Sequence, residues 1–350
     1  MIRFDCDYLE GAHPAILKKL EETNLCQTLG YGVDPFCQSA ADKIRAACEL
    51  PGAAVHFLVG GTQTNTTVIY SLLRPHQGVL SADTGHINCH ESGAIEGTGH
   101  KVIAVPGVDG KLTGKLIEDT YCAWRDDASW EHIVQPGMVY ISQPTETGTL
   151  YKKQELQEIY AVCQKYHLPL YIDGARLAYG MASAENDLTL PELARLCDIF
   201  YIGGTKVGAL FGEALVIPDP ALIPDIRPLI KQRGGLLAKG RLLGLQFDVL
   251  FTDGLYFELG RHAVKLAQVL KEGFAAKGYS FMCDSSTNQQ FPILSLEQAE
   301  RLGKDFSFDD YGPADETHRN VRFCTSWATK PENVDALCKD LKRLLNQRKK

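Results

Sequence analysis

Seven short apolar runs alternate with segments of helical periodicity over roughly the first 220 residues of the 350-residue chain. Each run is rich in Val, Ile, Leu or Tyr and is bounded by polar, glycine or proline positions. Continuous apolar runs of this kind are typical of strands buried on both faces of a sheet that helices cover. The sequence therefore predicts an α/β fold with a mostly parallel sheet. The runs are residues 54–59, 78–81, 101–105, 138–142, 169–172, 199–202 and 214–217.

The pattern changes near residue 253. There the helical spacing of Leu259, Leu266 and their neighbours predicts a long amphipathic helix, with Asp253 as its N-cap. Two strand-like pieces follow, at residues 290–296 and 321–326. We therefore predict a large domain over residues 1–250 and a smaller C-terminal α+β domain over residues 251–350. This division allows the N-terminal segment to associate with the smaller domain.

Composition excludes several classes of protein. The net charge of -7 argues against binding to a nucleic-acid backbone, and no apolar run approaches the ~18 residues of a membrane span. The 11 cysteines are odd in number and form no Cys-x-x-Cys pair, which indicates reduced thiols and a cytoplasmic location. His86, Cys89 and His90 lie close together but lack a second ligand pair, so we expect no metal site.

Two of the predicted strands end in residues suited to chemistry. Asp173 closes the run in LPLYIDGAR, where the carboxyl end of a parallel strand faces the ligand crevice, and Arg176 follows three residues later. An arginine in this place can bind a carboxylate through two parallel hydrogen bonds. Lys206 lies in the turn of DIFYIGGTKVGAL, where partial burial lowers a lysine pKa and frees the amine for a Schiff base. The plainer interpretations are a helix cap paired with an arginine, and an exposed turn lysine.

A third turn follows the first predicted strand, in VHFLVGGTQTN. Backbone N–H groups at the start of the next helix, with the Thr62 hydroxyl, can hold an anion, although an ordinary strand–helix turn explains the same pattern. Taken together, the three turns offer a phosphate cup, an acid for a ring nitrogen and an amine for an aldehyde. The cofactor that needs all three is pyridoxal 5'-phosphate (PLP).

On these residues the chain resembles the low-specificity threonine aldolase and β-eliminating lyase family, PLP enzymes of fold type I with an aspartate aminotransferase-like fold. The resemblance covers nearly the whole chain. The segments that carry it are Gly61-Thr62-Gln63, His86 in GHINCHESGA, Asp173-Gly174-Ala175-Arg176, Thr205-Lys206-Val207-Gly208, Gly234-Gly235 and Arg322.

The resemblance implies a role for each of these residues. Lys206 carries the cofactor, Asp173 pairs with its ring nitrogen, and His86 stacks on the ring. Arg176 and Arg322 bind the substrate carboxylate. The remaining cofactor contacts are expected from Gly61, Thr62, Gln63 and Thr205. The resemblance also implies a homodimer or homotetramer with sites between subunits, so that Tyr31 and Lys231 act in the neighbouring subunit's site.

One position departs from the family pattern. Threonine aldolases carry a Thr-His step near the end of the strand before the aspartate strand, and this chain has Thr145-Glu146 there. Glu146, a water that it positions, or His86 is therefore the expected base for cleavage of a β-hydroxy-α-amino acid into glycine and an aldehyde. A β-eliminating lyase or an aminotransferase for a small amino acid is the alternative, since the same sites serve either reaction. A PLP-binding protein without catalysis is a further alternative.

Overall fold

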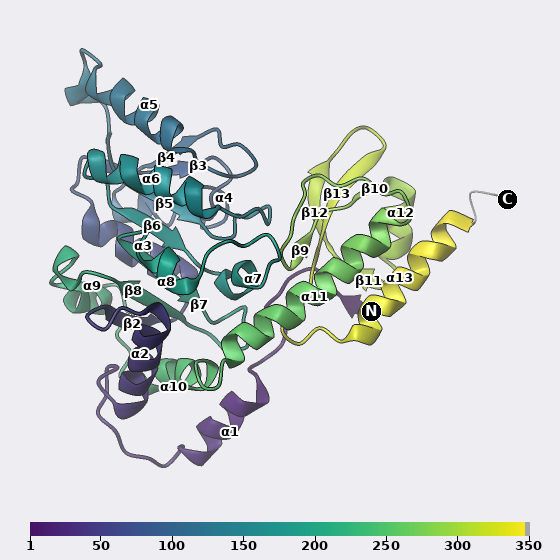
Figure 1. The fold of residues 1–350 in the computed structure, drawn as a ribbon, viewed down its shortest axis with the longest axis horizontal. Helices are drawn as coiled ribbons and strands as arrows, with labels where there is room; N and C mark the ends of the chain where they lie inside the picture. The colour runs from purple at the N-terminus through teal and green to yellow at the C-terminus, as the bar shows by residue number, and fades with distance from the viewer. Residues whose placement is uncertain (347–350) are drawn as a thin grey trace.

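The structure is a computed structural model, and it describes residues 1–346. All seven predicted runs form strands of one seven-stranded sheet. Its strand order is β2-β8-β7-β6-β5-β3-β4, and only β8 runs against its neighbours (Figure 1). The strands are β2 (Ala54–Leu58), β3 (Gln77–Ala82), β4 (Val102–Val105), β5 (Gln135–Ser142), β6 (Leu170–Asp173), β7 (Ile199–Gly203) and β8 (Glu213–Ile217).

Helices cover both faces of this sheet, as the continuous apolar runs predict. Successive strand residues point to opposite faces, so that Tyr140 enters one core cluster and Ile141 the other. The Ile141 face packs against α2 (Pro35–Cys48), α5 (Gly114–Arg125), α6 (Lys153–Lys165), α8 (Leu190–Ala194) and α10 (Arg241–Leu250). The Tyr140 face packs against α3 (Gly61–Leu72) and α9 (Ile226–Gln232). Helices therefore cover both faces of the sheet, and a ligand site is expected at the ends of its strands.

The C-terminal part has its own antiparallel sheet and its own core. Its strands lie in the order β10-β13-β12, and β9 also pairs with β13. Phe274 and Phe323 lie in the centre of its core. The elements are α11 (Leu255–Ala275), β9 (Gln289–Gln290), β10 (Ile293–Ser295), α12 (Leu296–Leu302), β11 (Phe306–Ser307), β12 (Asp309–Pro313), β13 (His318–Cys324) and α13 (Pro331–Asn346).

The N-terminus lies with this smaller part. β1 (Ile2–Arg3) pairs in parallel with β11, and Phe4 is fully buried in the smaller core. The chain then passes through α1 (Pro14–Glu22) to the large sheet, while α11 runs from the large part into the small one (Figure 1). We propose a domain boundary near residue 250, with the first residues joined to the C-terminal part.

Two details of the C-terminal part differ from the sequence analysis. Asp253 does not cap the long helix, because Asp253 and Gly254 both adopt left-handed backbone and Gly254 occupies the cap position. Strand β12 was also not predicted, because its DDYGP sequence is polar; the strand is half-exposed, and a register shift interrupts its pairing with β13. None of the helices in the described part of the chain has the length and apolar character to cross a bilayer.

Candidate active site

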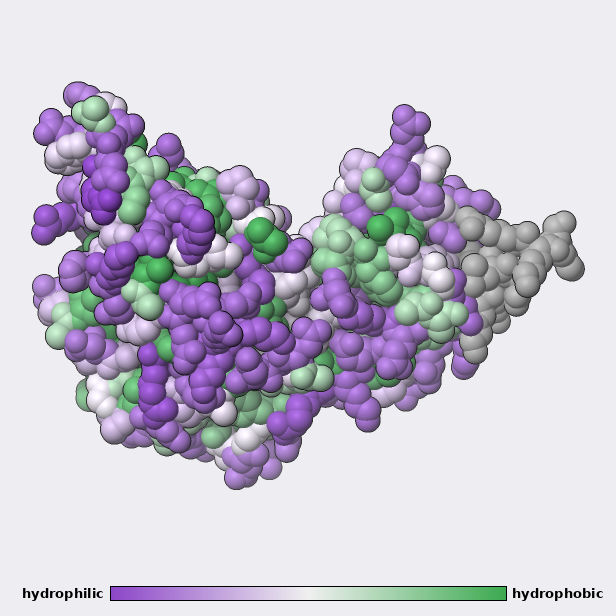
Figure 2. Space-filling view, turned by 45° about the horizontal axis from the view of Figure 1, so that its top comes forward, coloured by the Kyte–Doolittle hydropathy of each residue, from purple (hydrophilic) through white to green (hydrophobic). Residues whose placement is uncertain are grey.

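Most of the predicted site residues gather where the parallel strands of the large sheet end. Because β2, β3, β5, β6 and β7 run in one direction, the turns that follow them meet at one edge. A cavity of about 530 Å³ opens between this edge and the small part, and Figure 2 shows the surface hollowed between the two parts. Its size suits a small-molecule site. It is lined by Tyr8, His86, His90, Glu146, Arg176, Lys206, Asp309, Asp310, Tyr311 and Arg322.

Asp173, the last residue of β6, lies in a cage of hydrogen-bond donors. The Tyr201 hydroxyl (2.5 Å) and the Ala175 N–H (3.0 Å) donate to Oδ1, while the Tyr140 hydroxyl (2.6 Å) and the Asn65 amide (3.3 Å) donate to Oδ2. Burial opposes ionisation, but the nearby His86 and the tyrosine hydroxyls hold the pKa of Asp173 below its usual range. Asp173 does not cap the next helix, α7 (Leu177–Met181), because Arg176 occupies that cap position.

Lys206 lies in the loop, residues 204–212, that joins β7 to β8. Glu213 fixes this loop by accepting hydrogen bonds from the Gly204 N–H (3.0 Å) and the Thr205 hydroxyl (2.8 Å). A side chain on Gly204 would collide with Phe247, so only glycine permits this path. Burial and the charge of Arg176 lower the pKa of Lys206, which favours the free amine. The Thr205 hydroxyl is directed to Glu213, a carboxyl whose pKa burial raises to about 7.

The turn between β2 and α3 offers backbone N–H groups near Asp173. Gly60 is the N-cap of α3 and supplies no side chain, so the first-turn amides have no side-chain acceptor. A Cβ atom on Gly61 would lie 3.0 Å from the Tyr201 hydroxyl, which places this turn beside the Asp173 cage. Gln63 instead braces the turn: its Oε1 accepts from the Val59 N–H (3.1 Å), and its Nε2 donates to the Arg233 carbonyl (3.3 Å). Thr62 precedes it and has an exposed side chain.

His86 opens α4 (His86–Cys89), and its ring is oriented by Glu91, a residue that the sequence analysis did not identify. His86 Nδ1 lies 2.7 Å from Glu91 Oε1, and the Asn65 amide donates to the same oxygen (2.7 Å). Burial lowers the pKa of His86, but the Glu91 carboxylate and the charge of Asp173 outweigh it and raise the pKa overall. The available signal was a carboxylate five residues after a histidine in GHINCHESGA.

Both predicted arginines line the cavity, and each already contacts a carboxylate of the chain. Arg176 forms a two-point ion pair with Asp7, with Nε–Oδ2 and NH2–Oδ1 distances of 2.7 and 3.0 Å. Arg322 donates from NH2 to Asp309 Oδ2 at 2.8 Å. Neither carboxylate was predicted, because Asp7 lies 169 positions from Arg176 and Asp309 lies on β12, a strand that the sequence pattern did not reveal.

Glu146 follows β5 and also lines the cavity. Its Oε1 accepts hydrogen bonds from the Ser142 hydroxyl (2.6 Å) and from the backbone N–H of His86 (3.0 Å). Burial raises the pKa of Glu146, with the Ser142 hydrogen bond opposing this effect. At a given pH, a larger fraction of the Glu146 carboxyl is therefore protonated than in an exposed glutamate. Glu146 can accept a proton only in its ionised form.

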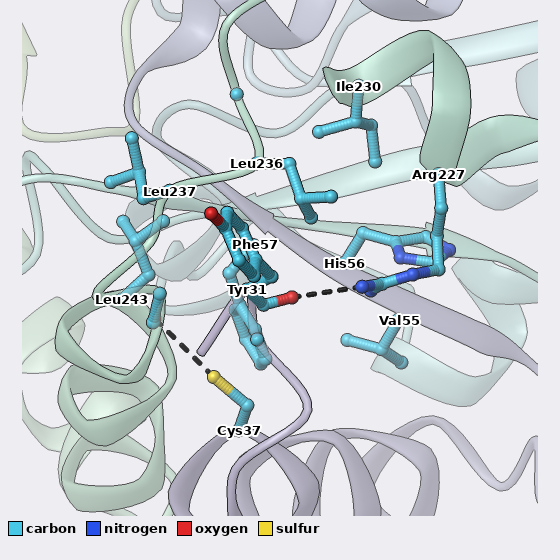
Figure 3. A pocket seen from close by; sticks show the side chains of 13 residues that line it. Tyr31, Cys37, Val55, His56, Phe57, Arg227, Ile230, Leu236, Leu237 and Leu243 are labelled. Atoms are coloured by element: carbon cyan, nitrogen blue, oxygen red, sulfur yellow. Dashed lines mark hydrogen bonds between the residues drawn. The ribbon is translucent and has the colours of Figure 1, made fainter. Parts of the chain in front are cut away.

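Tyr31 and Lys231 do not join the other predicted residues within one chain. Lys231 Nζ lies 4.6 Å from the centre of the Tyr31 ring, and Arg227 NH2 donates to the Tyr31 carbonyl at 3.0 Å (Figure 3). Tyr31 lines a separate small cavity of about 30 Å³ and is 44% exposed. Neither Tyr31 nor Lys231 lines the cavity around Lys206.

Comparison with known proteins agrees with this geometry. The family model of β-eliminating lyases matches residues 11–296. A low-specificity L-threonine aldolase from a Pseudomonas species is 30% identical, over 98% of this chain and 98% of its own. A low-specificity L-threonine aldolase from Escherichia coli is 25% identical, over 78% of this chain and 79% of its own.

Solved structures show the same relationship. A threonine aldolase from Leishmania major superposes with a TM-score of 0.95 and 48% identity, covering 98% of this chain and 99% of its own. An aspartate aminotransferase from Thermus thermophilus superposes with a TM-score of 0.72 at 14% identity, covering 98% and 91%. At that identity the second match shows the fold alone, which is that of the fold type I PLP enzymes.

Proposed function

This chain belongs to the β-eliminating lyase family, and we propose that it cleaves the Cα–Cβ bond of β-hydroxy-α-amino acids such as threonine or allo-threonine. It is a PLP-dependent carbon–carbon lyase of the threonine aldolase type. The observation that carries this proposal is a cavity lined by Lys206 and two arginines, in a chain that matches threonine aldolases over nearly its whole length. The caged Asp173 lies behind its lining residue His86, to which it is linked through Asn65 and Glu91.

The residues around the cavity fit PLP. Asp173 is a buried carboxylate whose four hydrogen-bond donors favour the ionised form, which suits a protonated ring nitrogen. Lys206 supplies an amine of lowered pKa, and the first turn of α3 supplies amides for a phosphate. When bound, PLP supplies an aldehyde that reacts with amines and a ring that withdraws electrons from a breaking Cα bond.

The chain's own residues then bind the substrate and move protons. Arg322 and Arg176 provide positive charge for the substrate carboxylate, and His86 presents a ring whose orientation Glu91 fixes. Lys206, with its lowered pKa, exchanges protons near the Cα atom. Glu146 is the candidate group that accepts the β-hydroxyl proton, because it lines the cavity and replaces the family histidine.

Glu146→Gln is expected to lower kcat/KM for threonine and allo-threonine by about 10²-fold or more, since general bases contribute about 10²–10⁴. Retention of PLP should change little, because in the described structure the carboxyl group of Glu146 accepts hydrogen bonds from Ser142 and from the backbone N–H of His86, and not from Lys206. Since burial raises the pKa of Glu146, we also expect the acidic limb of the kcat profile to lie above the ordinary glutamate pKa, and to disappear in the variant. Equal rates for the wild type, Glu146→Gln and Glu146→His would show that the base lies elsewhere.

We also propose a homodimer or homotetramer in which Tyr31 and Lys231 reach the site of the neighbouring subunit. The support is that these side chains contact each other at the surface, away from the cavity of their own chain. Leu25, Leu29 and Val33, in the same segment, are all more than half exposed, as expected of a surface that a second subunit covers. A fully active monomer in analytical ultracentrifugation at assay concentration would contradict this proposal.

We further propose a cytoplasmic location, which the free state of all eleven cysteines supports.

The decisive experiment for the reaction is product analysis. Purified holoenzyme is incubated with threonine, allo-threonine, serine and phenylserine, and glycine and aldehyde are measured. Equal amounts of glycine and aldehyde support the proposal. Pyruvate with ammonia would identify β-elimination, and a keto acid formed only with an acceptor would identify transamination. Binding of the amino acids without any product would identify a non-catalytic PLP protein.

A further inference from the structure

The two arginines of the cavity are held by their internal carboxylates in very different ways. Asp7 has no exposed surface, uses both oxygens on Arg176, and also accepts a hydrogen bond from the Asn288 amide at 2.8 Å. Asp309 is 47% exposed at its side chain and contacts Arg322 through Oδ2 alone. Removing Asp7 from its partner would leave a buried charge uncompensated, whereas Asp309 can turn into water at little cost.

The hydrogen bonds of the Arg322 guanidinium indicate which of its N–H donors are available to a substrate carboxylate. NH1 already donates to Gln289 Oε1 and to the Tyr311 hydroxyl, both at 3.1 Å. On the other edge, NH2 donates to Asp309 Oδ2 at 2.8 Å and to the Asp5 carbonyl at 3.3 Å, while Nε is buried and has no hydrogen-bond partner in the described structure. A carboxylate binds an arginine best through two parallel hydrogen bonds. Nε and NH2 offer such a pair, and Asp309 uses only half of it.

We propose that Asp309 is a displaceable internal competitor for the substrate carboxylate at Arg322. The substrate takes the Nε–NH2 edge, and Asp309 swings toward solvent. The position of Asp309 permits this movement, because it begins β12, which is an edge strand and pairs with β13 alone among the described strands. Asp309 therefore weakens substrate binding without contributing to the chemical step, and it favours ligands whose carboxylate can make both hydrogen bonds. This inference rests on the proposed amino-acid substrate.

Asp309→Asn is expected to tighten glycine binding by about two- to fivefold, since partly exposed ion pairs of this kind are weak but measurable. The primary measurement is the dissociation constant of glycine for the PLP-loaded enzyme, taken from the change in cofactor absorbance. The KM for threonine should fall by a similar factor, while kcat should change less than about twofold, because the removed contact belongs to the free enzyme. Asp309→Ala, which removes the contact altogether, should act in the same direction.

Asp310→Asn is the matched control. It removes the same charge from the neighbouring position of the same strand, but Asp310 is bonded to Arg319 and not to Arg322. We expect less than half of the shift seen in Asp309→Asn. Equal shifts of the glycine dissociation constant in the two variants would mean that the overall charge of the cavity is responsible. Weaker glycine binding in Asp309→Asn would mean that Asp309 holds Arg322 in place. Either result overturns the inference. Because glycine binding is measured without turnover, a failure of the aldolase proposal would appear separately, as missing products.

Discussion

Replacing Lys206 with alanine is expected to lower kcat/KM for β-hydroxy amino acids by about 10³-fold or more and to remove covalent attachment of the cofactor. Among the described residues, Lys206 is the one lysine that lines the cavity, so none of their other amines is placed to substitute for it. Burial and Arg176 lower its pKa, which gives it a larger fraction of free amine at neutral pH than a surface lysine has. The measurement is kcat/KM, together with borohydride reduction and peptide mapping of the wild type.

Lys165→Ala is the appropriate control. Lys165 lies on α6, is paired with Glu118 at the surface, and is absent from the cavity lining. Its replacement should leave both activity and labelling unchanged. The assignment of Lys206 would be wrong if reduction placed the pyridoxyl group on a different lysine, or if Lys206→Ala retained the covalent cofactor.

Much of the large sheet could be predicted from the sequence, because its strands are buried on both faces. Each run must be apolar throughout, and this signal depends on local sequence alone. Strand β12 gave no such signal, since its side chains are half-exposed and its register is interrupted. The position of α11 was predicted from its buried face, but not its cap, since the left-handed backbone at Asp253 and Gly254 is set by the turn that precedes the helix.

In the candidate site, too, some residues could be predicted from the sequence and others could not. Asp173 and Lys206 could be predicted because Asp173 follows one apolar run directly and Lys206 lies in the glycine-containing turn after another, and the sheet then brings the ends of these adjacent strands together. Asp7 could not, because its partner Arg176 lies 169 positions away. Asp309 could not, because β12, the strand that places it opposite Arg322, was not predicted. The arginines were thus predicted as partners of the substrate carboxylate, whereas the structure pairs both with acidic side chains of the chain itself. Charge pairing across a tertiary fold has no local signature.

Asp173→Asn is expected to keep PLP but to lower kcat by about 10³-fold. An ion pair at ~4 Å and an effective dielectric constant near 20 is worth roughly 4 kcal/mol, which corresponds to a pKa change of about three units for the paired nitrogen. The amide has no charge to supply this stabilisation. The cavity should remain intact, because Oδ1 of asparagine can still accept from the Tyr201 hydroxyl and the Ala175 N–H. On the other side, the new NH2 group faces Asn65 Nδ2, a second donor, so some local destabilisation is expected.

Tyr140→Phe separates the charge of Asp173 from its hydrogen bonds. It removes the 2.6 Å hydrogen bond to Asp173 and leaves the carboxylate in place. Because Tyr140 helps to hold the pKa of Asp173 low, this pKa should rise, and a fall in kcat of about tenfold is expected from a single hydrogen bond to a charged group. The ratio between the two variants is the informative quantity. If charge is what matters, Asp173→Asn must be far slower than Tyr140→Phe at equal PLP occupancy, whereas similar rates would mean that Asp173 serves mainly to order the tyrosines around it.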